Sequence, residues 1–167
     1  LRVVRVNKSR SLLLYLHLKS LLMAKTIIQK IVFKNLPIAT LYNTYMNAKE
    51  HSASVGVIAK IQNKQGAKFS AHDSYVTREK SSTNQGQIVQ SWRASDWSKS
   101  DVDSTFILLF EQMGNDSIIT MVHANVPDKH FAGVKAGWDD YYWNPGKNIL
   151  LKKQKNKMPL SEPAKPV

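Results

Sequence analysis

The side chains best suited to chemistry in this sequence include several aspartates, and their spacing limits what they can do. Asp139 and Asp140 are adjacent in a predicted helix, so they point about 100° apart and cannot face each other as a catalytic carboxylate pair. Asp96, Asp101 and Asp103 lie near one predicted loop, but they lack the spacing and the distal glutamate of a calcium-binding loop. Asp139 and Asp140 are better explained as a solvated edge and a capping or ion-pairing group, and we expect no calcium ion at the other three aspartates.

The histidines, and the residue types that the sequence lacks, also give no sign of a metal site or a catalytic site. His51, His72, His123 and His130 do not have the spacing of metal ligands, and we expect each to be a surface or edge histidine. The sequence contains no cysteine, so it has neither a thiol nucleophile nor a disulfide framework. It also has no glycine-rich phosphate loop and no serine elbow. We therefore expect no metal, no cofactor and no catalytic residue, and an enzyme is the least favoured of the functions considered below.

Aromatic side chains are the remaining signal. They could line an apolar pocket with a few convergent polar groups, for which Arg93, His123 and Tyr75 are candidates. The alternative is that the same rings fill the core, because large aromatic side chains interdigitate well. The candidates for lining the cavity are Phe69, Tyr75, Trp92, Phe106, Phe110, His123, Trp138 and Tyr142.

One long amphipathic helix must position several of these rings. At about 100° per residue, an apolar stripe runs along the segment from Lys129 to Tyr142 and on toward Leu150. Pro145 removes a backbone hydrogen bond and clashes with the preceding turn, so we expect the helix to kink or end near Asn144. The stripe consists of Phe131, Val134, Trp138, Tyr141, Tyr142 and Ile149, and we expect Trp138 to be largely buried.

A series of strands supplies the apolar partner of this helix. Alternation with a period of two begins at Lys25 and returns after residue 56, with turn residues between the runs. Two short helices, opened by Pro37 and ended by Gly56, follow the first strand. Seven mostly antiparallel strands and one long helix make an α+β fold. The predicted strands are residues 25–34, 57–62, 67–72, 75–78, 87–94, 103–113 and 117–126, with a polar connection at residues 79–86.

Two motifs resemble one protein family. The strand from Ile88 to Arg93 with the following Asp96-Trp97, and the helical segment from Gly137 to Trp143, are similar to small bacterial domains related to the C-terminal domain of the activator of heat-shock protein 90 ATPase. The resemblance covers about residues 24–150 and implies membership of the START-like (SRPBCC, helix-grip) superfamily. It implies a curved antiparallel sheet of six or seven strands around a long C-terminal helix, often with an apolar cavity between them.

Three functions follow from the residues and the resemblance together. The first is a single-domain protein that binds a hydrophobic small molecule or lipid between the sheet and the C-terminal helix. The second, implied by the resemblance, is an interaction domain whose partner is a heat-shock protein 90-type chaperone. The named activators also use a separate N-terminal domain, and residues 1–22 are too short to form one. The third is an enzyme of unknown reaction.

Positive charge is concentrated at the two ends of the chain. The net charge is +12, of which residues 1–22 carry +5 and residues 151–167 carry +4, so nucleic acid is not the expected partner of the body. We predict a domain at residues 23–150, a basic and apolar extension at residues 1–22, and a disordered proline-containing tail at residues 151–167. No apolar run reaches the roughly 20 residues of a membrane span, and we expect a cytoplasmic protein, with a secretory signal at residues 1–22 as the alternative.

Overall fold

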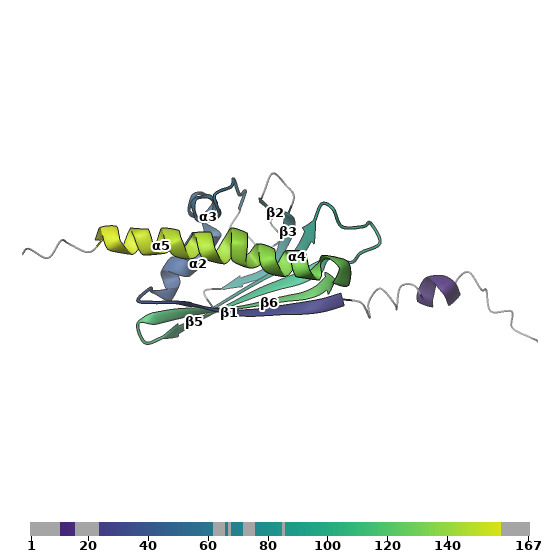
Figure 1. Ribbon diagram of the computed structural model, residues 1–167, viewed down its shortest axis with the longest axis horizontal. Helices are drawn as coiled ribbons and strands as arrows, with labels where there is room; N and C mark the ends of the chain where they lie inside the picture. The colour runs from purple at the N-terminus through teal and green to yellow at the C-terminus, as the bar shows by residue number, and fades with distance from the viewer. Residues whose placement is uncertain are drawn as a thin grey trace, which may run out of the picture.

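A six-stranded antiparallel sheet carries a long helical segment along one face (Figure 1). The computed structural model describes residues 11–15, 24–61, 66, 68–71, 76–84 and 86–157. The strand order β1-β6-β5-β4-β3-β2 brings the first strand beside the last. The elements are β1 (Ala24–Phe33), α2 (Ile38–Met46), α3 (Ala48–Val55), β2 (Lys68–Ala71), β3 (Val76–Asn84), β4 (Gln87–Ala94), β5 (Ser104–Met113), β6 (Asp116–Pro127), α4 (Asp128–Trp138), η1 (Asp139–Trp143) and α5 (Asn144–Lys157). This is the predicted α+β helix-grip architecture.

The strands on which the core is built follow the alternation in the sequence. In β1, Ile27, Ile31 and Phe33 are buried, whereas Ile28 and Val32 on the opposite face are exposed. Strand β4 has the predicted bounds, and every second residue from Ile88 onward is buried. Because successive side chains of a strand point to opposite faces, this pattern sends one row of each strand toward the helix.

One predicted strand is too short, and another is represented only by an isolated bridge in the described residues. Residues 79–84 were expected in a polar connection, but they continue β3 and pair with β4 as far as Asn84 opposite Gln87. Their sequence is almost wholly polar, so the strand has no alternation to reveal it and depends on backbone pairing with its neighbours. In the predicted strand at residues 57–62, the described residues contain only an isolated bridge from Lys60 to Ser70.

The two short helices after β1 are fixed at their ends by local chemistry. Helix α2 follows Pro37, as predicted, and the Ile38 N–H donates to the side-chain oxygen of Gln112 over 2.8 Å. Helix α3 is capped by the Asn47 side chain, which accepts from the Glu50 N–H, and it ends at Gly56 with φ of 74°. Glycine suits that left-handed position because it has no Cβ to clash.

The turn between β1 and α2 is tied to the hairpin that joins β5 and β6. Asp116 accepts from the Lys34 ammonium over 2.7 Å and from the Asn35 N–H over 3.0 Å, and Asn35 has φ of 50°. These bonds, the largest being that from Lys34, hold the pKa of Asp116 below its ordinary value. The acidic side chain therefore stabilises a turn whose backbone a non-glycine residue rarely adopts.

The C-terminal helical segment contains a π turn that shifts its apolar face. In η1 the Asn144 N–H donates to the Asp139 carbonyl oxygen, a five-residue step in place of the usual four. Compared with a regular α-helix, the extra residue of this turn shifts the buried face by one position along the sequence. Trp143 and Leu150 are therefore buried, whereas Tyr141 is 61% exposed. The predicted stripe is correct at Trp138 but wrong at Tyr141, because periodicity of 3.6 residues does not anticipate a π turn.

Of the two predicted outcomes near Asn144, a kink or an end of the helix, the end is wrong. Helical structure continues through Pro145 to Lys157. Proline is costly inside an α-helix because it lacks the N–H that bonds four residues back and its ring clashes with that carbonyl. Here the π turn interrupts the α-helical pattern immediately before Pro145, which therefore occupies the first turn of α5, where proline is tolerated.

The two chain ends are described in part. Residues 11–15 form one helical turn whose side chains are all exposed. Residues 151–157 of the expected tail belong to α5, and residues 1–10, 16–23 and 158–167 lie outside the described part of the chain. Within the described residues, no helix combines the length and apolar character that crossing a membrane would require.

Candidate functional site

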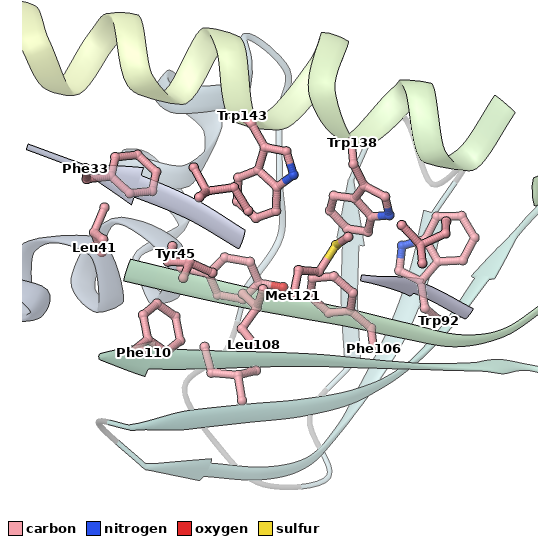
Figure 2. Packing of buried hydrophobic residues seen from close by; sticks show 14 of the residues in the cluster. Phe33, Leu41, Tyr45, Trp92, Phe106, Leu108, Phe110, Met121, Trp138 and Trp143 are labelled. Atoms are coloured by element: carbon pink, nitrogen blue, oxygen red, sulfur yellow. The ribbon is translucent and has the colours of Figure 1, made fainter. Parts of the chain in front are cut away.

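The aromatic side chains predicted to line a central cavity pack directly against one another. Trp138, which is 3% exposed as expected for a buried residue, stacks on Phe106 with ring centroids 4.6 Å apart. Trp92 contacts Trp138 at a centroid distance of 6.4 Å. Figure 2 shows Trp138 and Trp143 pointing from the helical segment toward the sheet, where Phe106 and Met121 meet them. These rings therefore fill the centre of the grip.

His123 is part of this packed centre and is fully buried. The Trp138 indole N–H donates to His123 Nδ1 over 3.1 Å, and His123 Nε2 lies 2.7 Å from the Ser104 hydroxyl oxygen. Ser104 donates its hydrogen to the Trp92 carbonyl oxygen over 2.7 Å, so it accepts from His123. These contacts require a neutral imidazole with its proton on Nε2. Sequence reasoning identified His123 as a polar group of the site, and the structure engages both ring nitrogens within the core.

The other predicted cavity residues lie toward α2 and α3. Phe69, on β2, is 1% exposed and contacts the His51 ring at a centroid distance of 5.3 Å. Phe110, on β5, meets Tyr42 of α2 edge-on at 5.7 Å. Tyr142 is partly buried and lies against Trp138 at 4.7 Å. Tyr75 lies outside the described residues.

Unfilled space occurs near α5, away from the packed centre. A pocket of about 50 Å³ lies between α2, α3 and the start of α5, and a groove of about 150 Å³ lies between the end of β1 and α5. Phe33 and Leu150 line both, so these two side chains form a wall between them. The pocket is lined by Phe33, Leu41, Thr44, Tyr45, His51, Ser54, Val55, Ile119, Tyr142, Trp143, Gly146 and Leu150.

His51 connects two tyrosines that line this pocket, Tyr45 and Tyr142. Its Nδ1 lies 3.1 Å from the Tyr45 carbonyl oxygen, which can only accept, so Nδ1 carries the proton. Nε2 of the neutral ring then accepts from the Tyr142 hydroxyl over 3.4 Å. Sequence reasoning treated His51 as a surface histidine, but it is 1% exposed. The available signal was the spacing of His51, Ser54 and Val55, which matches one buried face of a short helix.

Two adjacent residues of the π turn, Tyr142 and Trp143, both line this pocket. Tyr142 lies within η1, and its ring meets the His51 ring edge-on at a centroid distance of 5.6 Å. Trp143, the last residue of the same turn, lines the pocket beside it. In a regular α-helix, adjacent side chains point about 100° apart, whereas the wider turn spaces them more closely around the axis. Such turns are frequent at functional sites.

Arg93, the third predicted polar group of a cavity, organises a surface loop. Its guanidinium donates to the carbonyl oxygens of Ser98 and Asp101 and pairs with the Asp103 carboxylate at 2.8 Å. Asp101 also pairs with Lys129 at 3.0 Å. Across the described residues, no three acidic or histidine side chains form a group that could hold a metal ion.

Four buried nitrogen atoms have no hydrogen-bond partner within the described part of the chain: Gln90 Nε2, Trp92 Nε1, Trp97 Nε1 and His130 Nε2. Gln90 uses its other amide atom to accept from the Tyr45 hydroxyl over 2.7 Å. Trp97 stacks on His130 with ring centroids 5.8 Å apart. Buried donors of this kind are commonly satisfied by ordered water.

Solved structures share this architecture. An HSP90 activator from Plasmodium falciparum is 24% identical, covers 78% of this chain and 96% of its own, and has a TM-score of 0.63. Protein MLL2253 from Mesorhizobium loti is 12% identical, with coverages of 77% and 98% and a TM-score of 0.66. CalU16 from Micromonospora echinospora is 14% identical, with coverages of 80% and 83% and a TM-score of 0.61. At these identities the likeness concerns the fold. No curated protein matches the sequence.

A family model establishes the relationship that the two sequence motifs indicated. The model described as Activator of Hsp90 ATPase homolog 1-like protein matches residues 35–145. The matched span runs from the turn after β1 to the first turn of α5 and includes both the β4 motif and the π turn. The predicted START-like, helix-grip resemblance is therefore confirmed, and the chain belongs to the Activator of Hsp90 ATPase homolog 1-like family.

Proposed function

We propose that this protein is a binding domain that takes an apolar group into the pocket beside His51 and Tyr142. The carrying observation is a mostly apolar lining combined with a few hydrogen-bonded polar groups, among them His51 and Tyr142, which is the usual composition of a small-molecule site. The centre of the grip is an unsuitable location, because Trp92, Phe106 and Trp138 already fill it.

The size of the pocket limits what it can hold. Ligand pockets usually enclose roughly 300–1,000 Å³, whereas this pocket encloses about 50 Å³ and the adjoining groove about 150 Å³. An apolar cavity of roughly 150 Å³ is large enough for benzene. The proposal is therefore restricted to a small molecule, or to the apolar end of a larger one that enters between Phe33 and Leu150.

Two glycines of the helical segment offer a matched test. Gly146 lines the pocket and a Cβ built on it meets no atom within 4 Å, so Gly146→Leu would add an apolar side chain to the pocket wall without a backbone clash. Gly133 of α4 is equally open but does not line the pocket. Both changes replace glycine with a good helix former, so their effects on the helix are comparable.

The measurement is calorimetric titration of the protein with 1-octanol. We expect saturable binding to the unchanged protein and to Gly133→Leu, and binding weakened at least tenfold in Gly146→Leu. The absence of saturable binding to the unchanged protein, or equal binding by the two variants, would overturn the proposal. Thermal unfolding of both variants provides the control for folding.

A second candidate function is interaction with an Hsp90-type chaperone. The observations that favour it are the family match at residues 35–145 and the solved HSP90 activator that is similar over 96% of its own length. A filled core is compatible with a domain that works through its surface. The test is the ATPase rate of purified Hsp90 with increasing amounts of this protein. Stimulation that Gly146→Leu leaves unchanged would support this candidate and separate it from binding in the pocket.

A further inference from the structure

We propose that the groove between β1 and α5 selects an amphiphile with one apolar chain and an anionic head, of the fatty-acid type. This inference rests on the proposed function and names the class of ligand. The floor and walls of the groove are formed by Val32, Phe33, Leu36, Leu150 and Leu151, whereas Lys34 and Lys147 are its charged residues. An apolar groove beside ammonium groups suits a ligand that has both an apolar chain and an anionic head.

The charges around the groove are unequal. The Lys34 ammonium pairs with Asp116 at 2.7 Å, so the net charge of that pair is close to zero. Lys147 is half-buried, and within the described ranges it forms no ion pair with an acidic side chain. The sequence of α5 contains further lysines and no acidic residue. The uncompensated charge at the groove is therefore positive, and it attracts an anion.

The path of the apolar chain follows from the shared wall. Phe33 and Leu150 separate the groove from the pocket beside His51, and both side chains are less than 8% exposed. A chain whose head lies near Lys147 would pass between these two side chains and place its end against Leu41 and Trp143, which line the pocket. The carboxylate would remain at the open groove, so it would avoid most of the desolvation cost of a buried charge.

The experiment compares two probes of equal chain length, octanoate and 1-octanol, on Lys147→Met and on a control. Methionine removes the charge but keeps a flexible apolar side chain of similar length. Lys135→Met removes an exposed lysine from α4, which does not line the groove. We expect Lys147→Met to weaken octanoate binding by about threefold, the scale of an exposed ion pair. Its effect on 1-octanol should be less than half as large, and Lys135→Met should leave both affinities unchanged.

The outcomes separate this inference from the function on which it rests. If 1-octanol binds but Lys147→Met changes the two affinities equally, or changes neither, the inference is overturned and the proposed function stands. If neither probe binds the unchanged protein, both are overturned. Two further results would support a charge interaction at the groove. Lys147→Arg should retain octanoate binding, and at about 0.5 M salt Lys147→Met should no longer weaken octanoate binding more than 1-octanol binding.

Discussion

The indole N–H of Trp138 donates to Nδ1 of His123 across the interface between helix and sheet, over 3.1 Å. Both residues are buried, so neither partner can turn to water if the other is removed. This bond fixes which nitrogen of His123 carries the proton and ties α4 to β6. A polar contact thus helps to orient two buried side chains within a cluster of aromatic rings.

Trp138→Phe should be more destabilising than Trp92→Phe. Both changes remove a similar volume from the same aromatic cluster. Of these two tryptophans, Trp138 has a hydrogen-bonded indole N–H, whereas Trp92 Nε1 has no hydrogen-bond partner in the described part of the chain. We expect an additional loss of about 1–3 kcal/mol in the free energy of unfolding for Trp138→Phe, because the buried His123 Nδ1 loses the hydrogen bond that the indole N–H donates. Urea denaturation of both variants measures it, and equal losses would contradict the role assigned to the bond.

Pro145 and the π turn should be energetically coupled. Deletion of Asp140 removes one residue from η1, so the following residues can join a regular α-helix with Leu150 still facing the sheet. Pro145 would then lie in a helix interior, at a cost of about 3 kcal/mol. We expect Pro145→Ala to recover most of that loss in the deletion variant but to change the unaltered protein by less than about 1 kcal/mol. Thermal and urea unfolding would be measured for the unaltered protein, the Asp140 deletion, Pro145→Ala and the double variant. Additive effects of the two changes would contradict the coupling.

Acidification should remove the contribution of Asp116 to stability. Its pKa is lowered in the folded protein by Lys34 and the Asn35 N–H, so its stabilisation is present above the ordinary value of 3.8 and is lost as the pH falls through the lower folded value. Asp116→Asn should therefore be less stable than the unchanged protein at neutral pH, and the difference should shrink below pH 3.8. Unfolding curves at several pH values measure this. In a Lys34→Met background, the stability difference caused by Asp116→Asn should depend less on pH. If that pH dependence is undiminished, the Lys34 ammonium is not its cause.

The sequence was most informative where side-chain alternation was strong. Strand β4 was predicted with its observed bounds because two sets of side chains alternate along it, Ile88, Gln90 and Trp92 on one face and Val89, Ser91 and Arg93 on the other. Strand β3 was cut short because its residues are polar on both faces and are held by pairing with β4. The short helices were predictable from Pro37 and Gly56, whose backbone preferences are local.

The candidate site was less predictable, because its position depends on geometry that the sequence does not state. Periodicity identified Trp138 as buried, but the π turn transferred the apolar face to Trp143 and Leu150. The choice between a filled and a hollow core depends on ring packing across elements, as in the stack of Phe106 on Trp138. His51 is distant in sequence from Tyr142, and only the folded chain brings them together.

The most direct test of the proposed site is a titration of methyl-labelled protein with 1-octanol, followed by NMR. We expect saturable shifts of the methyl signals of Leu41, Val55 and Leu150, which line the pocket, with little change at Leu108 and Met121 in the packed centre. Shifts centred on Leu108 and Met121 would place the ligand between the sheet and Trp138. That result, or the absence of any saturable shift, would contradict the account.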